Sequence, residues 1–101
     1  AGDMATRGYF SHVSPEGEWH WDRLREVGAP FGYAGENIGY YCVGRSPGEP
    51  AIQTLFDMMM AETPPNDGHR QNILSPHYRK LGVGVARSAD GKLYWVCDFT
   101  D

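Results

Sequence analysis

The most constraining feature of the sequence is a pair of alternating apolar segments near its C-terminus. LGVGVAR at 81–87 and KLYWVCDF at 92–99 both alternate with the period of two that is typical of β-strands. Residues 89–91, Ala-Asp-Gly, lie between them and carry a turn signal. The two segments therefore predict a terminal β-hairpin. A third strand is predicted at 37–44, which is aromatic and punctuated by glycine.

The first strand of this hairpin has one face of branched apolar residues and one face almost without side chains. The second face leaves room for another element to come close to the strand. The apolar face consists of Leu81, Val83 and Val85, and the small face consists of Gly82, Gly84 and Ala86.

Two shorter segments predict helices. Residues 19–29 carry apolar side chains at helical spacing and reach a stop signal at Gly28. Another short helix is expected to be capped by Asn66 or Asp67 and to run to about Leu74. His69 then lies in the first turn of that helix.

A longer helix is predicted at 46–62. Ser46 is its expected N-cap, Pro47 occupies the first helical position, and Glu49 completes a capping box. Glu62 lies at its end. Its methionines could form an adaptable binding surface, but their spacing favours core packing. The residues assigned to the core here are Ile52, Leu55, Phe56 and the run Met58, Met59 and Met60.

Length and charge limit the function classes. A chain of 101 residues is expected to form one domain, 1–101. Its formal charge of −4 disfavours a general attraction to nucleic acid. No apolar run is long enough for a transmembrane segment, and the N-terminus lacks the order of a signal peptide. We therefore expect a soluble and processed chain.

Two cysteines, Cys42 and Cys97, each lie in an aromatic segment predicted to be a strand. Their spacing fits neither a zinc knuckle nor a CxxC redox pair. Two alternatives stay open: buried thiols that act as small apolar residues, or a disulfide between neighbouring strands in an oxidising compartment.

Two histidines and two glutamates could carry chemistry. His12 lies in a predicted loop, His69 at a helix start, Glu36 at the head of a strand and Glu62 at a helix end. Imidazole nitrogens and carboxylate oxygens suit Zn²⁺ or a similar divalent ion. The same groups without metal could act as general acid and base. They come from four segments with no local metal signature, so spacing alone does not assemble them.

Several motifs in order along the chain resemble one known family. They are YFSHVSPEG at 9–17, AGENIGY at 34–40, GHRQNILSPHYRKLGVGVA at 68–86, and the closing strand YWVCDF at 94–99. Together they resemble the bacterial SCP-like branch of the CAP superfamily, which includes cysteine-rich secretory proteins, venom antigen 5 and plant pathogenesis-related proteins. The resemblance covers nearly the whole chain.

This resemblance implies an α+β fold, an α-β-α sandwich of CAP type with a central antiparallel sheet. It also implies an extracellular, secreted protein with a surface cleft that can hold a divalent metal. Relatives normally have a further N-terminal helix, so we expect this domain to be short at its N-terminus. An apolar face left by a missing helix predicts a homodimer that covers it.

The resemblance also assigns residues to the cleft. Zn²⁺ is the expected metal, with Ca²⁺ or Mg²⁺ as alternatives. The cysteine pair is not part of the family pattern in bacterial members. By motif, the metal site corresponds to His12, Glu36, Glu62 and His69; His12, Glu36 and His69 are catalytic if the protein is an enzyme; Arg70 and Asn72 are polar ligand-binding groups.

The resemblance leaves three functions open. The first is a metal-binding module whose cleft binds a ligand or partner, such as a lipid, a cell-wall component or a host component. The second is a metal-dependent hydrolase, of peptidase or cell-wall type, that uses the same cleft. The third is a structural or lipid-binding module. The aromatic residues that could line a lipid groove are expected instead in the core; they are Trp19, Trp21, Tyr40, Tyr41, Tyr94 and Trp95.

Overall fold

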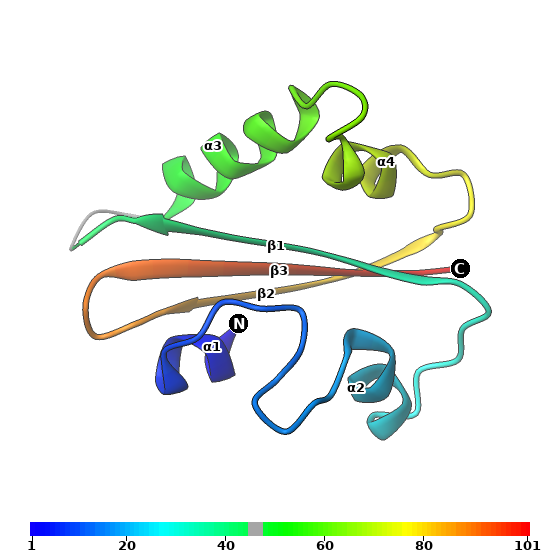
Figure 1. Cartoon of the computed structure of the whole chain (residues 1–101), viewed down its shortest axis with the longest axis horizontal. Helices are drawn as coiled ribbons and strands as arrows, with labels where there is room; N and C mark the ends of the chain where they lie inside the picture. The colour runs from blue at the N-terminus through cyan, green and yellow to red at the C-terminus, as the bar shows by residue number, and fades with distance from the viewer. Residues whose placement is uncertain (45–47) are drawn as a thin grey trace.

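The chain folds as a three-stranded antiparallel sheet with helices on both faces (Figure 1). The structure is a computed structural model that describes residues 1–44 and 48–101. Helices α1 and α2 lie on one face of the sheet, and α3 and α4 lie on the other. This arrangement confirms the predicted α+β fold. The elements are α1 (Gly2–Arg7), α2 (His20–Glu26), β1 (Ala34–Cys42), α3 (Glu49–Met60), α4 (Gly68–Leu74), β2 (Lys80–Arg87) and β3 (Lys92–Thr100).

The sheet has the strand order β1-β3-β2, so β3 is central and β1 and β2 are edge strands. The predicted terminal hairpin is confirmed as the antiparallel pair β2 and β3. The third strand begins earlier than the predicted 37–44. Gly35 and Glu36 continue the ladder opposite Phe99 and Asp98, which places Glu36 inside the strand.

A hydrophobic core fills each face of the sheet. On the α3 and α4 face, Leu55 and Met59 pack against Trp95 and Phe99 of β3. On the α1 and α2 face, Met4, Ile38 and Tyr94 form a second cluster. Because side chains alternate along a strand, odd residues of β1 and β3 face α3 and even residues face α1.

Most of the aromatic residues predicted in the core are not buried. Tyr94 and Trp95, in the central strand, are 4% and 7% exposed as expected. The prediction is wrong for the others because β1 is an edge strand, and because the two tryptophans flank the start of the short helix α2. Trp19, Trp21, Tyr40 and Tyr41 are 40%, 36%, 45% and 44% exposed.

The apolar stripe of α3 is likewise only partly buried. Leu55 and Met59 are 7% and 5% exposed, in agreement with the expected core. Phe56 and Met58 are 38% and 60% exposed, so their assignment to the core is wrong. Helix α3 lies on the face of β1, and only one side of the helix meets the sheet (Figure 1).

The helix boundaries follow the predictions in part. Helix α2 is shorter than the predicted 19–29, and α4 has Asp67 as its N-cap, one of the two expected caps. The predicted cap Ser46 and the adjacent Pro47 lie outside the described residues. In the described part, α3 begins at Glu49 with Pro50 in its first turn. None of the helices described in this structure is long and apolar enough to cross a membrane.

The small face of β2 meets α1, as its glycines predicted. A Cβ atom built on Gly84 would lie 3.7 Å from the Cβ of Ala1, so the helix approaches the strand closely there. The opposite side chains, Leu81 and Val83, are both 57% exposed.

The two cysteines are free thiols, so the disulfide alternative is wrong. In the sheet register Cys97 lies opposite Asn37 and Cys42 lies opposite Lys92, so the two residues do not face each other. Cys97 is buried whereas Cys42 is exposed. Burial raises the pKa of the Cys97 thiol to about 11.

We therefore expect the two thiols to differ in reactivity. A maleimide reagent at neutral pH should label Cys42 rapidly in the native protein, and Cys97 only after unfolding in denaturant. Intact-mass spectrometry should show one adduct under native conditions and two in guanidinium chloride. Two adducts on the native protein, or none in denaturant without a reductant, would contradict this assignment.

Candidate functional site

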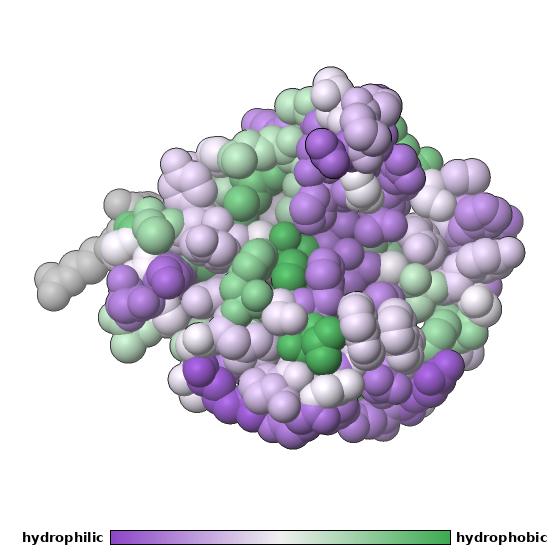
Figure 2. All heavy atoms as spheres, viewed as in Figure 1, coloured by the Kyte–Doolittle hydropathy of each residue, from purple (hydrophilic) through white to green (hydrophobic). Residues whose placement is uncertain are grey.

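The structure brings the four predicted residues to one cleft, between the loop after α1 and the helices α3 and α4. The cleft has two connected parts, and His12, Glu62 and His69 line both of them. The polar part has a volume of about 500 Å³ and is also lined by Glu36 and by asparagine and glutamine side chains. The apolar part has a volume of about 760 Å³. Figure 2 shows apolar residues beside a band of hydrophilic residues in the middle of this face.

His12 is held by Glu36. Its Nδ1 atom lies 2.9 Å from Oε1 of Glu36, whose side chain is 1% exposed. An ionised carboxylate only accepts hydrogen bonds, so Nδ1 carries the proton and Nε2 keeps its lone pair. Burial, the repulsion that His12 and His69 would exert if both rings were protonated, and the positive charge of Arg23 lower the pKa of the His12 imidazole. The neutral imidazole is therefore the favoured form at neutral pH.

His69 is held by Glu62 in the same way. Its Nδ1 atom lies 2.7 Å from Oε2 of Glu62, and the backbone N–H of Arg70 donates to Oε1 at 3.1 Å. Burial raises the pKa of the Glu62 carboxyl, but the hydrogen bonds from His69 and Arg70 outweigh burial, and the pKa lies below its usual value. Glu62 is therefore ionised and a strong acceptor for the imidazole.

Asn37 ties the helix that carries His69 to the sheet. It is 1% exposed, and its Nδ2 donates to the backbone carbonyl of His69 at 3.0 Å. Asn72 donates to Oδ1 of Asn37 at 2.8 Å and to the carbonyl of Glu36 at 3.3 Å. These amides fix α4 against β1, because moving the helix would leave buried polar groups without hydrogen-bond partners and so cost free energy.

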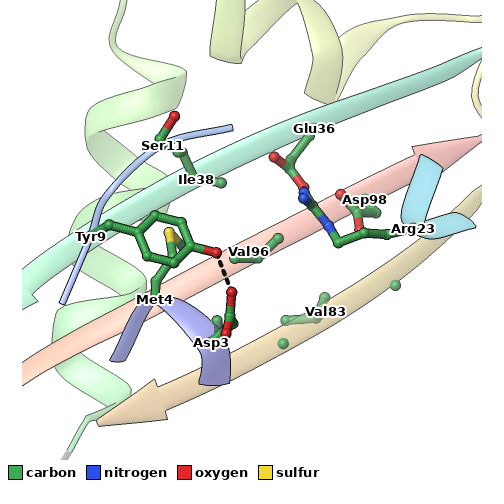
Figure 3. Close-up of a pocket in the computed structure, with 13 residues that line it drawn as sticks. Asp3, Met4, Tyr9, Ser11, Arg23, Glu36, Ile38, Val83, Val96 and Asp98 are labelled. Carbon is green, nitrogen blue, oxygen red and sulfur yellow. Dashed lines mark hydrogen bonds and ion pairs between the residues drawn. The ribbon is translucent and has the colours of Figure 1, made fainter. Parts of the chain in front are cut away.

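Arg23 ties the loop that carries His12 to the sheet. Its guanidinium donates to Oε2 of Glu36 at 2.9 Å and to the backbone carbonyls of Glu18 and His12 at 3.1 Å and 3.4 Å. In Figure 3, Arg23 from α2, Glu36 from β1 and Asp98 from β3 point toward one another. One side chain thus joins the loop, the helix and the strand.

Asp98 lies beside Glu36 in the sheet register. Burial, a hydrogen bond with Glu36 and the negative charge of Glu36 raise the pKa of Asp98 to about 7. His20 and Arg23 oppose this shift, since their positive charges lower the pKa. Asp98 is therefore partly protonated at neutral pH, and its protonated carboxyl donates to Glu36.

The geometry differs from the expected four-ligand metal site. Among residues 1–44 and 48–101 no group of three or more His, Cys, Asp and Glu side chains is arranged to hold a metal ion. Glu36 and Glu62 are directed at the Nδ1 atoms of the histidines. Because the carboxylates are paired with the Nδ1 atoms, the atoms of these four side chains that can bind a metal are the Nε2 atoms of His12 and His69.

The predicted polar ligand-binding residues divide between two places. Asn72 lines the polar part of the cleft, as expected. Arg70 lines a separate depression beside Leu74 and Tyr78, and its contribution to the cleft is the backbone N–H given to Glu62. A contact between the Arg70 side chain and a ligand stays a prediction.

Sequence reasoning did not single out three functional residues: Arg23, Asn37 and Asp98. Asp98 could have been noticed as a carboxylate inside an apolar strand, and Asn37 as the residue next to Glu36. Arg23 offered no local signal, because its partners are distant in the sequence.

Comparison with known sequences identifies similar proteins along almost the entire chain. A family model described as CAP, the cysteine-rich secretory protein family, matches residues 1–99. The uncharacterized membrane protein YlbC of Bacillus subtilis (strain 168) is 39% identical over 85 residues, which are 84% of this chain and 21% of YlbC. The uncharacterized protein YkwD of the same strain is 31% identical over 86 residues, which are 85% of this chain and 29% of YkwD.

A solved structure is similar as well. It is the crystal structure of an extracellular protein containing an SCP domain from Bacillus anthracis str. Ames, with a TM-score of 0.65 and 33% identity. The matched region covers 97% of this chain and 28% of that chain. This chain therefore spans less than a third of the length of each of these relatives.

The raised pKa of Asp98 predicts a pH-dependent stability. A carboxyl whose pKa is raised in the folded state contributes stability below its unfolded pKa, and this contribution is lost as the pH rises from about 4 to about 7. Asp98→Asn removes the titration and donates to Glu36. We expect the variant to be more stable than the parent at pH 8, by on the order of 1 kcal/mol. Urea unfolding at several pH values measures this, and parallel stability curves for the two proteins would contradict it.

The amide network predicts a large effect at Asn37. Asn37→Ala leaves the carbonyl of His69 without its partner and removes one of the two acceptors of the Asn72 amide, which should cost about 1 to 3 kcal/mol of unfolding free energy. Gln53→Ala is a matched control, since its amide donates to Asp57 on an exposed helix surface. Thermal and urea unfolding compare the two variants. Equal, small losses would show that the network does not stabilise the site.

Proposed function

Because the chain belongs to the CAP family, the cysteine-rich secretory protein family, we propose that it is an extracellular domain that binds a ligand in its His–Glu cleft with a divalent cation. The family description and the extracellular relative support the location. The cleft supports the activity, because it gathers both histidines and both glutamates into one hollow.

The observation that carries the proposal is the pairing of each Nδ1 atom with a carboxylate. The distances are 2.9 Å for His12 and 2.7 Å for His69. A carboxylate on one ring nitrogen fixes the tautomer and makes the other nitrogen a better metal ligand. Both imidazoles in this protein have a carboxylate on Nδ1, and both line the same two cavities.

The donor set fits a metal that accepts two imidazoles and takes its remaining ligands from water or the bound ligand. Zn²⁺ favours such nitrogen donors, whereas Ca²⁺ and Mg²⁺ favour oxygen. The carboxylates are engaged by the imidazoles, so Zn²⁺ suits His12 and His69 best. When bound, such an ion supplies a Lewis acid that polarises a ligand oxygen.

A hydrolase is a second candidate, and one observation favours it. The lowered pKa of His12 keeps its imidazole neutral near pH 7, so Nε2 can accept a proton from water or substrate when no metal occupies it. Glu36 then stabilises the imidazolium through Nδ1. Hydrolysis that persists after metal removal and is lost in His12→Gln would support this role.

Two further expectations from the family resemblance are a structural or lipid-binding role and a homodimer. A structural or lipid-binding module predicts that replacing the histidines changes no affinity for metal. The homodimer stays a prediction, and light scattering of the purified protein tests it.

Zinc titration by calorimetry tests the proposed function. Metal-stripped protein should bind about one Zn²⁺ per chain, and His12→Ala or His69→Ala should abolish saturable binding. Glu62→Gln should weaken it by about 10- to 100-fold, since it loosens the ring without removing a ligand. His77→Ala is the matched control, because His77 stacks on Tyr33 outside the cleft.

Failure of the folded parent to bind Zn²⁺ would overturn the metal site. Equal loss of binding in His77→Ala and His69→Ala would assign the metal elsewhere. Circular dichroism of each variant shows that the fold is kept.

A further inference from the structure

Strand β1 is an edge strand, and its free side forms the floor of the apolar part of the cleft. Among residues 1–44 and 48–101, β1 pairs with β3 on one side and with no strand on the other. Ile38, Gly39 and Tyr40 of β1 line the apolar part, together with His12 and His69. The cleft therefore runs along a strand edge, where backbone groups can meet a ligand.

The ladder shows which backbone groups face the cleft. N–H and C=O groups of one strand residue point to the same side, and successive residues alternate. The carbonyls of Lys92 and Thr100 in β3 accept from Ser88 and Arg79 next to β2. Even residues of β3 thus point to β2, and odd residues point to β1.

The partners of those odd residues are the odd residues of β1. Cys97 pairs with Asn37, and Trp95 pairs with Gly39. The N–H and C=O groups of Ile38 and Tyr40 are therefore directed away from β3. Glu36 is also an even residue of β1, and its carbonyl accepts from Asn72 on the side away from β3, in agreement with this assignment.

Apolar side chains stand on both sides of this strand edge. Leu55, Met58 and Met59 of α3 form one wall. Phe10 and Trp19 stand on the other side, in the loop between α1 and α2. Several are well exposed, with Met58 at 60% and Phe10 at 43%. A sheet edge between two apolar walls can bind both a backbone and its alternating side chains.

We propose that the cleft binds an extended polypeptide segment, which adds to β1 as a further strand. The segment exchanges backbone hydrogen bonds with Ile38 and Tyr40, and its side chains alternate between the wall of α3 and the wall of the loop. This inference rests on the proposed function of the cleft as a ligand site and names the class of ligand. Asn72 already occupies the carbonyl of Glu36, so the added strand ends beside the histidines.

Backbone geometry favours a polypeptide over an acyl chain. The free groups of Ile38 and Tyr40 repeat every second residue, about 6.6 Å apart along the strand. A β-strand presents amide donors and acceptors at the same repeat. An acyl chain has no donors to offer, and it would leave these groups without partners.

The test uses the full chain, labelled with ¹⁵N, and an equimolar pool of capped pentapeptides. Their three central residues are drawn from Leu, Val and Phe. Binding should slow hydrogen exchange at the amides of Ile38 and Tyr40 by at least about tenfold when saturated. The amide of Gly39 already lies on the β3 side and should change less.

Two matched controls separate strand addition from apolar contact. N-methylation of the alternate peptide amides that face β1 should weaken binding at least about tenfold, whereas N-methylation of the other amides should be tolerated. Met58→Lys should weaken binding similarly. Phe56→Lys, on the same helix but outside the cleft lining, should leave it unchanged.

Three results would overturn the inference: no peptide binding at millimolar concentration, equal effects of both N-methylation patterns, or protection away from Ile38 and Tyr40. Binding of dodecanoate or of an N-acetylglucosamine trimer in place of the peptides would assign the cleft to that ligand instead. A zinc titration of the same sample separates the two proposals. Zinc binding without peptide binding rejects only the peptide, and absence of both rejects the metal site as well.

Discussion

The buried carboxylate of Glu36 sets the geometry on which one half of the cleft depends. Its side chain is 1% exposed, so the charge must be matched inside the protein. One oxygen accepts from His12 and the other accepts from Arg23. Because Arg23 also donates to the carbonyls of Glu18 and His12, the same ion pair holds the loop that presents the imidazole. The position of His12 is thus a consequence of neutralising a buried charge.

The residue next to Glu36 supports the other half of the cleft. Side chains alternate across a strand, so Glu36 faces α2 whereas Asn37 faces α4. Asn37 accepts from Asn72 and donates to the carbonyl of His69. Two adjacent residues of β1 therefore position two histidines that approach from opposite faces of the sheet. Because both histidines are held by residues of β1, the cleft lies around the free edge of this strand.

The sequence predicted the elements whose signals are local. The period of two in 81–87 and 92–99 predicted the hairpin, and Asp67 was one of two expected caps for the helix that carries His69. The resemblance to the CAP family predicted that four residues share one cleft, and the structure has all four lining it: His12, Glu36, Glu62 and His69.

What the sequence could not predict depends on which faces are covered and on partners distant in the chain. Tyr40 has the composition of a core residue, but β1 is an edge strand and leaves it 45% exposed. The ion pair between Arg23 and Glu36 forms only when α2 packs on β1. The sequence also did not predict that the two glutamates contact the Nδ1 atoms of the histidines, since a motif assigns residues to a site but does not show which atom each one contacts.

The tautomers of His12 and His69 test the central claim most directly. Long-range ¹H–¹⁵N NMR of the metal-free protein, labelled at histidine nitrogens, reports which ring nitrogen carries the proton. In the neutral form of each ring, the carboxylate contacts predict Nδ1–H with Nε2 unprotonated. Resonances of an Nε2–H tautomer, or of rapidly averaged rings like that of a free imidazole, would contradict the account.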